Sequence, residues 1–247
     1  MNVQLERPGA AQSDLLIHFC GRGGSARQTP HVTPDILGLS PSERLDHILQ
    51  EEQFRAFPPF GAPRRNPMVC FSESPLPHLI HLIRDRGWQP WGVVVRREWV
   101  YSLGGGPVWY ARQEQFKQLT DTQKAWAVRF EVSAETRSDW THEREWRVPV
   151  DPDYPFLDFS PSDIVAILIG DPSWEPTKVT NIYKTGHPIN AITGEPCSPD
   201  NPYTIDEYPV DELPLSWQSA EIWIWDRDSE QIKRPDGSPL LEINYFS

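Results

Sequence analysis

The chain is poor in cysteine and has no long hydrophobic run. Its three cysteines, Cys20, Cys70 and Cys197, are an odd number and form no C-x-x-C pair, which excludes a disulfide framework and a four-cysteine zinc site. The longest apolar run, Ile164–Ile169, is far shorter than the roughly 20 residues that cross a bilayer, and the N-terminus lacks a signal-peptide core. We therefore expect a cytoplasmic protein without a membrane partner.

Positive charge is also scarce. Lysine and arginine number 23 against 35 acidic residues, so the formal net charge is −12. This balance argues against general attraction to nucleic-acid phosphates, although a local basic patch remains compatible with it. In contrast, 38% of the 247 residues are hydrophobic and 11 are tryptophan, enough for a sizeable core. The length predicts one large domain or two small ones.

Hydrophobic patterns predict an α+β domain with a mixed, mainly antiparallel sheet and a few helices. An amphipathic helix is expected to begin at Pro41, and a second over residues 75–86 with Ser74 as its cap. Predicted strands cover residues 15–20, 68–72, 91–95, 108–111, 143–150 and 164–169. The last is apolar throughout, which predicts a position in the middle of the sheet.

The pattern divides the chain into three parts. Residues 1–14 are polar and are expected to be flexible, and residues 15–185 form the predicted domain. Residues 186–247 are a Pro-rich acidic extension, predicted to be a long loop up to residue 215. A strand over residues 220–226 and a C-terminal hairpin, turning at 235–237 and returning over residues 240–246, are expected to pack on the same domain.

The segment 139–147, DWTHEREWR, is the most informative part for chemistry. On a strand, Glu143, Glu145 and Arg147 would share one face, with the carboxylates about 7 Å apart. Such a pair can hold a substrate hydroxyl and stabilise developing positive charge. The structural alternative is a solvated strand face striped with charge. Trp140 and Trp146 favour a packed strand.

Two other strand ends carry polar groups. His18 lies inside the first strand, and Arg22 follows in a glycine-rich turn that would suit a diphosphate. A buried histidine satisfied by a backbone carbonyl is the structural alternative for His18. Ser72 ends the second strand, where a hydroxyl can hold a carboxylate or a ribose. Ser74 is better explained as a helix cap.

Metal and thiol chemistry are not expected. His78, His81 and Asp85 have helical spacing, but histidines three apart on the polar side of an amphipathic helix are usually solvated. Cys20 and Cys70 lie in apolar strands, where a thiol is ordinarily buried and unreactive.

These three strand segments, with His18, Ser72 and the Glu143–Glu145 pair, together resemble the three-part signature of the ADP-ribosyltransferase superfamily. A closer resemblance is to AbiGi-type abortive phage-resistance proteins. It lies in four motifs: IHFCGR at 17–22, CFS at 70–72, GPVWY at 106–110 and a Trp-x-x-Glu-x-Glu-Trp-Arg strand at 140–147. In the last motif, one residue more than is usual in the family separates Trp140 from Glu143. The likeness covers roughly residues 15–150, and the Pro-rich extension departs from it.

The resemblance implies an ADP-ribosyltransferase-like fold, NAD binding and transfer of ADP-ribose to a macromolecule. It implies that Glu145 is the catalytic glutamate, holding the ribose 2′-hydroxyl, and that Glu143 positions or deprotonates the acceptor. The implied cofactor-binding residues are His18 and Arg22 for the ribose or diphosphate, Ser72 in support of Glu145, Tyr110 stacked on nicotinamide, and Arg147.

The acceptor stays open between protein and nucleic acid, the latter along a path of Arg64, Arg65, Arg96 and Arg97. A cognate antitoxin or a phage trigger is a further implied partner. The alternative from another class is a non-catalytic sensor or antitoxin-like interaction module of an abortive-infection system. A third possibility is a metal-dependent nuclease built on Glu143 and Glu145, which sensitivity to chelators would reveal.

Overall fold

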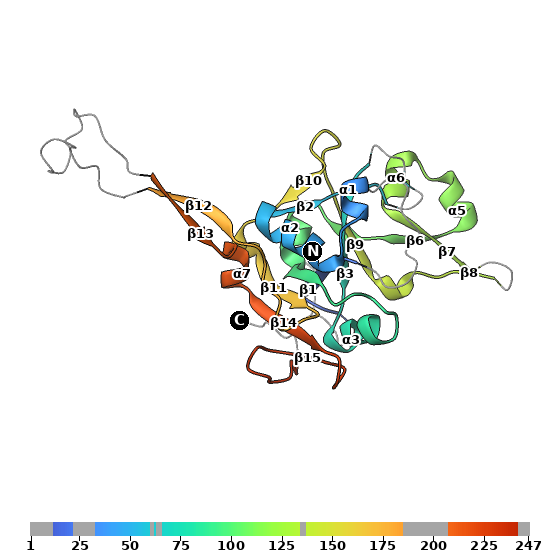
Figure 1. Ribbon diagram of the computed structural model, residues 1–247. Coiled ribbons are helices and arrows are strands. Elements are labelled where there is room, and N and C mark those ends of the chain that lie inside the picture. The colour runs from blue at the N-terminus through green and yellow to red at the C-terminus, as the bar shows by residue number, and fades with distance from the viewer. Residues whose placement is uncertain are drawn as a thin grey trace, which may run out of the picture.

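The computed structural model describes residues 12–21, 33–59, 62, 66–133, 137–184 and 207–241 (Figure 1). Arg22, Arg64, Arg65 and Cys197 lie outside these residues, as do most of the expected flexible N-terminus, much of the Pro-rich extension and the predicted return strand from residue 242 on. Among the described residues, no helix is long and apolar enough to cross a membrane.

The body of the protein is α+β, with one eight-stranded sheet. Its strand order is β15 (Gln231–Lys233), β14 (Glu221–Asp226), β11 (Ile164–Ile169), β4 (Gly92–Arg96), β1 (Leu15–Phe19), β3 (Met68–Glu73), β9 (Glu145–Pro149) and β5 (Gly106–Pro107). All neighbours are antiparallel except β11 and β14. The sequence therefore predicted a mixed, mainly antiparallel sheet correctly, including the inner position of β11.

Three small sheets complete the strands. They are β6 (Trp109–Arg112) with β7 (Ala127–Val132) and β8 (Arg137–Ser138), β2 (Gln53–Arg55) with β10 (Phe156–Asp158), and β12 (Val179–Lys184) with β13 (Glu207–Glu212). The pair β12 and β13 extends away from the body in Figure 1. Part of the segment predicted as a loop is therefore strand β13, which pairs with β12 along all six residues.

The helices are short. They are α1 (Pro34–Leu37), α2 (Pro41–Glu51), α3 (Leu76–Arg84), α4 (Arg97–Ser102), α5 (Gln113–Gln118), α6 (Asp121–Ala125) and α7 (Leu215–Ser219), with 3-10 turns η1 (Thr141–Glu143) and η2 (Pro161–Asp163). Helix α2 begins as predicted, with Ser40 and Glu43 in a capping box. The predicted cap of α3 was wrong, because Pro75 occupies the N-cap position and Ser74 instead contacts Ser72.

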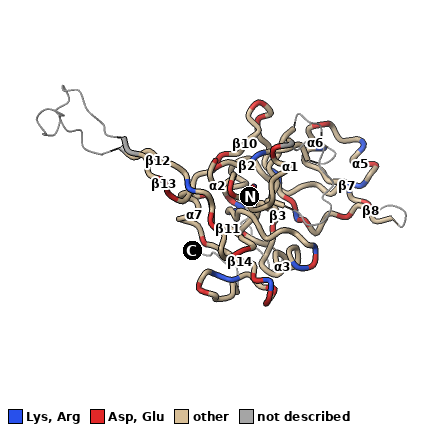
Figure 2. Tube along the Cα trace, in the orientation of Figure 1, with Lys and Arg blue, Asp and Glu red and all other residues tan. Residues whose placement is uncertain are grey.

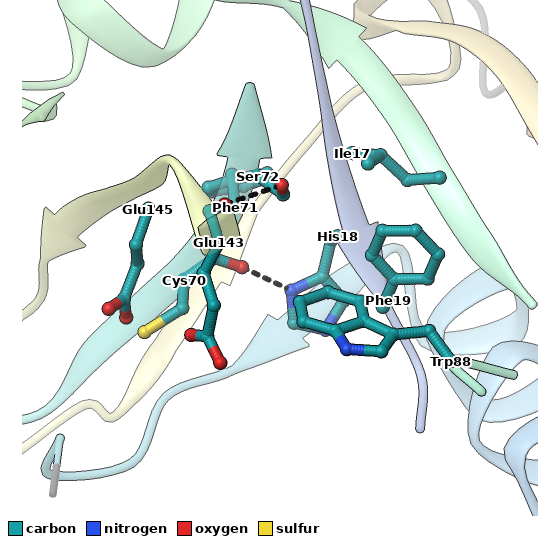
Figure 3. A pocket seen from close by; sticks show the side chains of 9 residues that line it. All are labelled: Ile17, His18, Phe19, Cys70, Phe71, Ser72, Trp88, Glu143 and Glu145. Atoms are coloured by element: carbon teal, nitrogen blue, oxygen red, sulfur yellow. Dashed lines mark hydrogen bonds between the residues drawn. The ribbon is translucent and has the colours of Figure 1, made fainter. Parts of the chain in front are cut away.

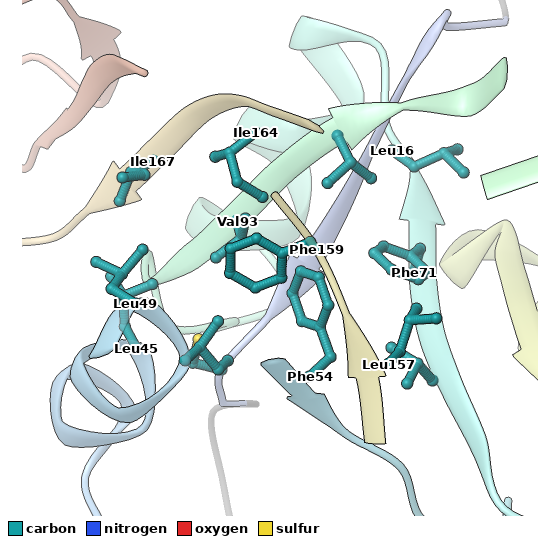
Figure 4. Close-up of a cluster of buried hydrophobic side chains, with 14 of the residues drawn as sticks. Leu16, Leu45, Leu49, Phe54, Phe71, Val93, Leu157, Phe159, Ile164 and Ile167 are labelled. Atoms are coloured by element: carbon teal, nitrogen blue, oxygen red, sulfur yellow. The ribbon is translucent and has the colours of Figure 1, made fainter. Parts of the chain in front are cut away.

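Hydrophobic clusters cover both faces of the sheet because strand side chains alternate. Leu16 packs with α2, β2 and Phe71 in one cluster (Figure 4). Leu15 and Ile17 pack with α3 in the other cluster. The strand β14 divides likewise, with Ile222 and Ile224 against the first cluster and Trp223 and Trp225 inside the second. This double packing fixes β1 in the middle of the sheet, beside β3.

The C-terminal hairpin turns earlier in the chain than expected. Strands β14 and β15 pair directly around residues 227–230, and the predicted turn at 235–237 comes after β15. It leads to an isolated bridge between Lys233 and Pro239.

Candidate functional site

Strands β1 and β3 separate at the point where His18 lies. β1 pairs with β4 along all five of its residues, from Leu15 to Phe19, but with β3 only at Leu16 and Ile17. Beyond Ile17, the imidazole of His18 takes the place of the next ladder contact, with Nδ1 2.8 Å from the carbonyl oxygen of Cys70. The sheet thus opens beside His18, and a side chain bridges the opening.

A small pocket occupies this opening (Figure 3). Its volume is about 90 Å³. The lining residues come from β1, β3, η1, β9 and the segment after α3: Ile17, His18, Phe19, Cys70, Phe71, Ser72, Trp88, Glu143 and Glu145. The pocket therefore brings together four predicted site residues from three separate segments of the chain: His18, Ser72, Glu143 and Glu145.

His18 is neutral at pH 7. Burial lowers the pKa of its imidazole, and the contact with the carbonyl of Cys70 only partly offsets this. Because a carbonyl only accepts, Nδ1 carries the proton, which leaves Nε2 as a hydrogen-bond acceptor. Among the described residues, no group is hydrogen-bonded to Nε2 of His18. Phe54 and Phe71 fix the orientation of the ring, with centroid separations of 5.0 and 5.8 Å. Nε2 can therefore accept a hydrogen bond from a hydroxyl group in the pocket.

Glu145 is held in place by Arg147. Nε and Nη2 of the arginine donate to Oε1 and Oε2 of the glutamate, each at 3.0 Å. Both residues are on β9 and share a face, as predicted, while Nη1 of Arg147 reaches the carbonyls of Ala125 and Ala127. Burial lowers the pKa of Arg147, but the charge and the hydrogen bonds of Glu145, with a contribution from Cys70, outweigh it and the net shift is upward. Arg147 thus lies behind Glu145 and does not line the pocket.

Glu143 does not belong to the strand. The predicted strand over residues 143–150 begins only at Glu145, and Glu143 ends the 3-10 turn η1. Arg144 between them is left-handed, with φ 45°, so the strand alternation that would align Glu143 with Glu145 is broken. Glu143 is nevertheless buried and reaches the same pocket from the turn.

Ser72 supports this turn. It lies opposite Glu145 in the register of β3 and β9, but its hydroxyl donates to the backbone carbonyl of Glu143 at 2.7 Å. Its oxygen is also 2.9 Å from that of Ser74. The expected support of Glu145 by Ser72 is therefore indirect, because the hydroxyl fixes the turn that precedes the glutamate.

Tyr110 lies next to the site without lining the pocket. Its hydroxyl donates to the carbonyl of Trp140 at 3.3 Å. Burial, together with the charges of Glu145 and Glu143, raises the pKa of Tyr110 to about 12, against a hydrogen bond from the backbone of Glu145. The phenol therefore stays protonated near both carboxylates.

Sequence reasoning missed Glu73, the last residue of β3. Its carboxylate is buried and receives hydrogen bonds from Arg144 Nη2 at 3.2 Å, Trp146 Nε1 at 3.1 Å and the backbone N–H of Ser13 at 3.1 Å. Arg97 lies 3.7 Å away. An acidic residue ending an apolar strand was the signal, because a buried carboxylate needs partners. Glu73 ties β3 to β9 beside the pocket.

Trp140 differs from Trp146 in its surroundings. Trp146 is packed, as expected, but Trp140 is 44% exposed.

His81 is 2.7 Å from Asp85, and within the described ranges no group of three His, Cys, Asp or Glu side chains could hold a metal.

Comparison with known proteins does not assign the chain to a family. No family model, no curated protein and no solved structure matches this chain.

Proposed function

We propose that the protein is an NAD-dependent ADP-ribosyltransferase with its site between β1, β3 and β9. One observation carries the proposal: His18, Ser72 and Glu145, on three adjacent strands, line one pocket where the sheet opens. The order of these strands along the chain is that of the ADP-ribosyltransferase signature, which supports an ADP-ribosyltransferase-like fold. The resemblance to abortive phage-resistance proteins further suggests a cytoplasmic toxin or defence protein with a macromolecular acceptor and a cognate antitoxin or phage trigger.

The side chains in the pocket suit a ribose. His18 Nε2 can accept one hydroxyl hydrogen bond, and the carboxylates of Glu143 and Glu145 can accept others. NAD supplies an ADP-ribosyl group already activated by its bond to nicotinamide. Glu145 is placed to stabilise the positive charge that develops on the ribose, and Arg147 holds its carboxylate in one orientation.

The size of the pocket limits what enters it. Ligand sites usually measure about 300–1,000 Å³, whereas this pocket is about 90 Å³. It accommodates a group the size of a single ring, so the nicotinamide ribose fits this position and the rest of the dinucleotide would lie outside it.

Release of nicotinamide from NAD by the purified protein tests this proposal. We expect turnover by the wild type and a loss of at least about 100-fold in Glu145→Gln, because the amide lacks the negative charge. Glu98→Gln, an exposed site on α4, is the matched control and should keep full activity. Equal rates for wild type and Glu145→Gln, with both folded, would refute the proposal.

A second candidate is the non-catalytic interaction module. The observation that favours it is that both oxygens of Glu145 are already bound by Arg147 in a small pocket. For this function, the wild type would bind no NAD, and substitutions at Glu145 would lower the stability of the fold alone.

A further inference from the structure

A connected group of half-buried and exposed aromatic and basic side chains lies on the two chain segments that lead into the pocket. His142 stacks on Trp140 with 6.2 Å between ring centroids, and Nη2 of Arg86 donates to Nε2 of His142 at 3.0 Å. The ring of His78 stacks on His81 at 6.3 Å, and His78 also contacts the backbone of His142. We call these five residues, Trp140, His142, Arg86, His78 and His81, the mouth cluster.

The mouth cluster is joined to the pocket through the chain. His142 immediately precedes Glu143, and Arg86 comes two residues before Trp88. Both Glu143 and Trp88 line the pocket. The chain therefore connects the cluster to the lining of the pocket at two points.

Two features show that the cluster is available to a ligand. Trp140 is 44% exposed, so part of its indole is open to solvent. Arg86 is exposed, and it donates a hydrogen bond to an imidazole nitrogen rather than to a carboxylate. In addition, Nδ1 of His78 is buried without a hydrogen-bond partner in the described part of the chain.

Two of the nearby acidic groups, Asp85 and Asp139, are already engaged. Asp85 is held by Arg84 and His81, and Asp139 accepts from the backbone and hydroxyl of Thr141. The guanidinium of Arg86 therefore remains for an anion, although the chain as a whole is acidic.

We propose that the mouth cluster binds single-stranded nucleic acid, the acceptor class for the reaction proposed above. An unpaired base stacks on Trp140, and the adjoining phosphate contacts Arg86, with imidazoles around it. Base stacking on an aromatic side chain beside a basic group is the usual way of binding single strands, and it needs a base whose face is free. A duplex does not offer such a face. This inference rests on the proposed function for its role, but the surface itself can be tested without NAD.

The predicted path along Arg64, Arg65, Arg96 and Arg97 is not used in this proposal. Arg97 is 2.9 Å from Asp14 and 3.7 Å from Glu73, so its charge is already balanced. Arg64 and Arg65 lie outside the described residues, and Arg96 is an exposed side chain at the end of β4.

Fluorescence anisotropy with labelled oligothymidylate and oligouridylate of about twelve nucleotides tests the proposal at low salt. We expect binding of at least one of the two single strands and weaker binding of the matching duplex. Trp140→Ala should weaken binding by about fivefold to 100-fold, the range found for a stacked base. Arg86→Ala should weaken it and lower the salt dependence by about one ion.

Trp109→Ala and Arg96→Ala are the matched controls. Trp109 is 51% exposed on β6, where it lines a separate groove beside α6. Both should bind as the wild type does. The proposal is overturned if no single strand binds or if the duplex binds better. It is also overturned if the control variants lose as much affinity as the cluster variants. A fourth contrary result is that the cluster variants change only the transfer of ADP-ribose to proteins. Nicotinamide release without single-strand binding would overturn this inference alone, and binding without release would overturn the proposed function.

Discussion

Arg147 bridges Glu145 and the backbone around Trp126. Its guanidinium binds both oxygens of the Glu145 carboxylate at 3.0 Å and also donates to the carbonyls of Ala125 and Ala127. The side chain of Arg147 is 4% exposed and that of Glu145 is 11% exposed. The pair therefore links the candidate site to the small sheet of β6, β7 and β8.

Replacing Arg147 by methionine should destabilise the fold by about 3–5 kcal/mol, because Glu145 and two carbonyls would lose their donor. Arg147→Lys should cost less, since one ammonium keeps the charge but not the bidentate geometry. Urea unfolding measures both changes in the free energy of unfolding. A loss below about 1 kcal/mol in Arg147→Met would show that the pair does not hold this region.

Removal of the Ser72 hydroxyl should have a smaller effect. Ser72→Ala leaves the carbonyl of Glu143 without its donor at 2.7 Å in a buried place, which costs about 1–3 kcal/mol in the free energy of unfolding. Ser102→Ala is the control, because the Ser102 hydroxyl donates to the carbonyl of Trp99 at the surface. It should change stability by less than about 0.5 kcal/mol. Equal losses in the two variants would argue against a special role of Ser72.

Glu73 is expected to be among the most sensitive acidic positions. Glu73→Ala removes the acceptor for Arg144, Trp146 and the backbone of Ser13, so we expect a loss of about 3 kcal/mol or more. Glu73→Gln keeps an acceptor oxygen and should recover part of it. Thermal unfolding compares these variants with Glu98→Gln, which should unfold like the wild type. If Glu73→Ala unfolded at the same temperature as the wild type, the hydrogen bonds to this carboxylate would not stabilise the fold as described.

Acid should weaken the fold through His18. Burial holds the folded-state pKa of His18 below its ordinary value of 6.5, so the unfolded chain takes up the proton more readily as the pH falls. The free energy of unfolding should therefore decrease between about pH 7 and the folded pKa. His18→Gln, which cannot titrate, should lose less stability over this interval. Urea unfolding at several pH values checks the slopes, and identical slopes would show that His18 titrates normally.

The parts of the fold that depend on local pattern were predictable. The capping box of α2 and the apolar strand β11 follow from neighbouring residues alone. The end of the Glu strand was not predictable in this way. Its alternation suggests a strand from Glu143, whereas the turn there is held by Ser72, which lies 71 positions earlier in the sequence.

The candidate site shows the same division. The residue types of His18, Ser72 and Glu145 identified chemistry, but sequence could not show that β1 and β3 separate after Ile17. That separation depends on which strand each residue pairs with. Similarly, Trp140 was expected to pack, and only the turn at η1 shows why it is exposed. The role of Glu73 likewise depends on partners from three parts of the chain.

A structure of the protein with NAD bound tests the central claim most directly. The account predicts that the nicotinamide ribose lies where β1 and β3 separate, with a hydroxyl in hydrogen-bond contact with Glu145 and another facing Nε2 of His18. Density for NAD elsewhere on the surface, or a pocket that stays closed with His18 and Glu145 out of contact with the ribose at saturating NAD, would contradict it.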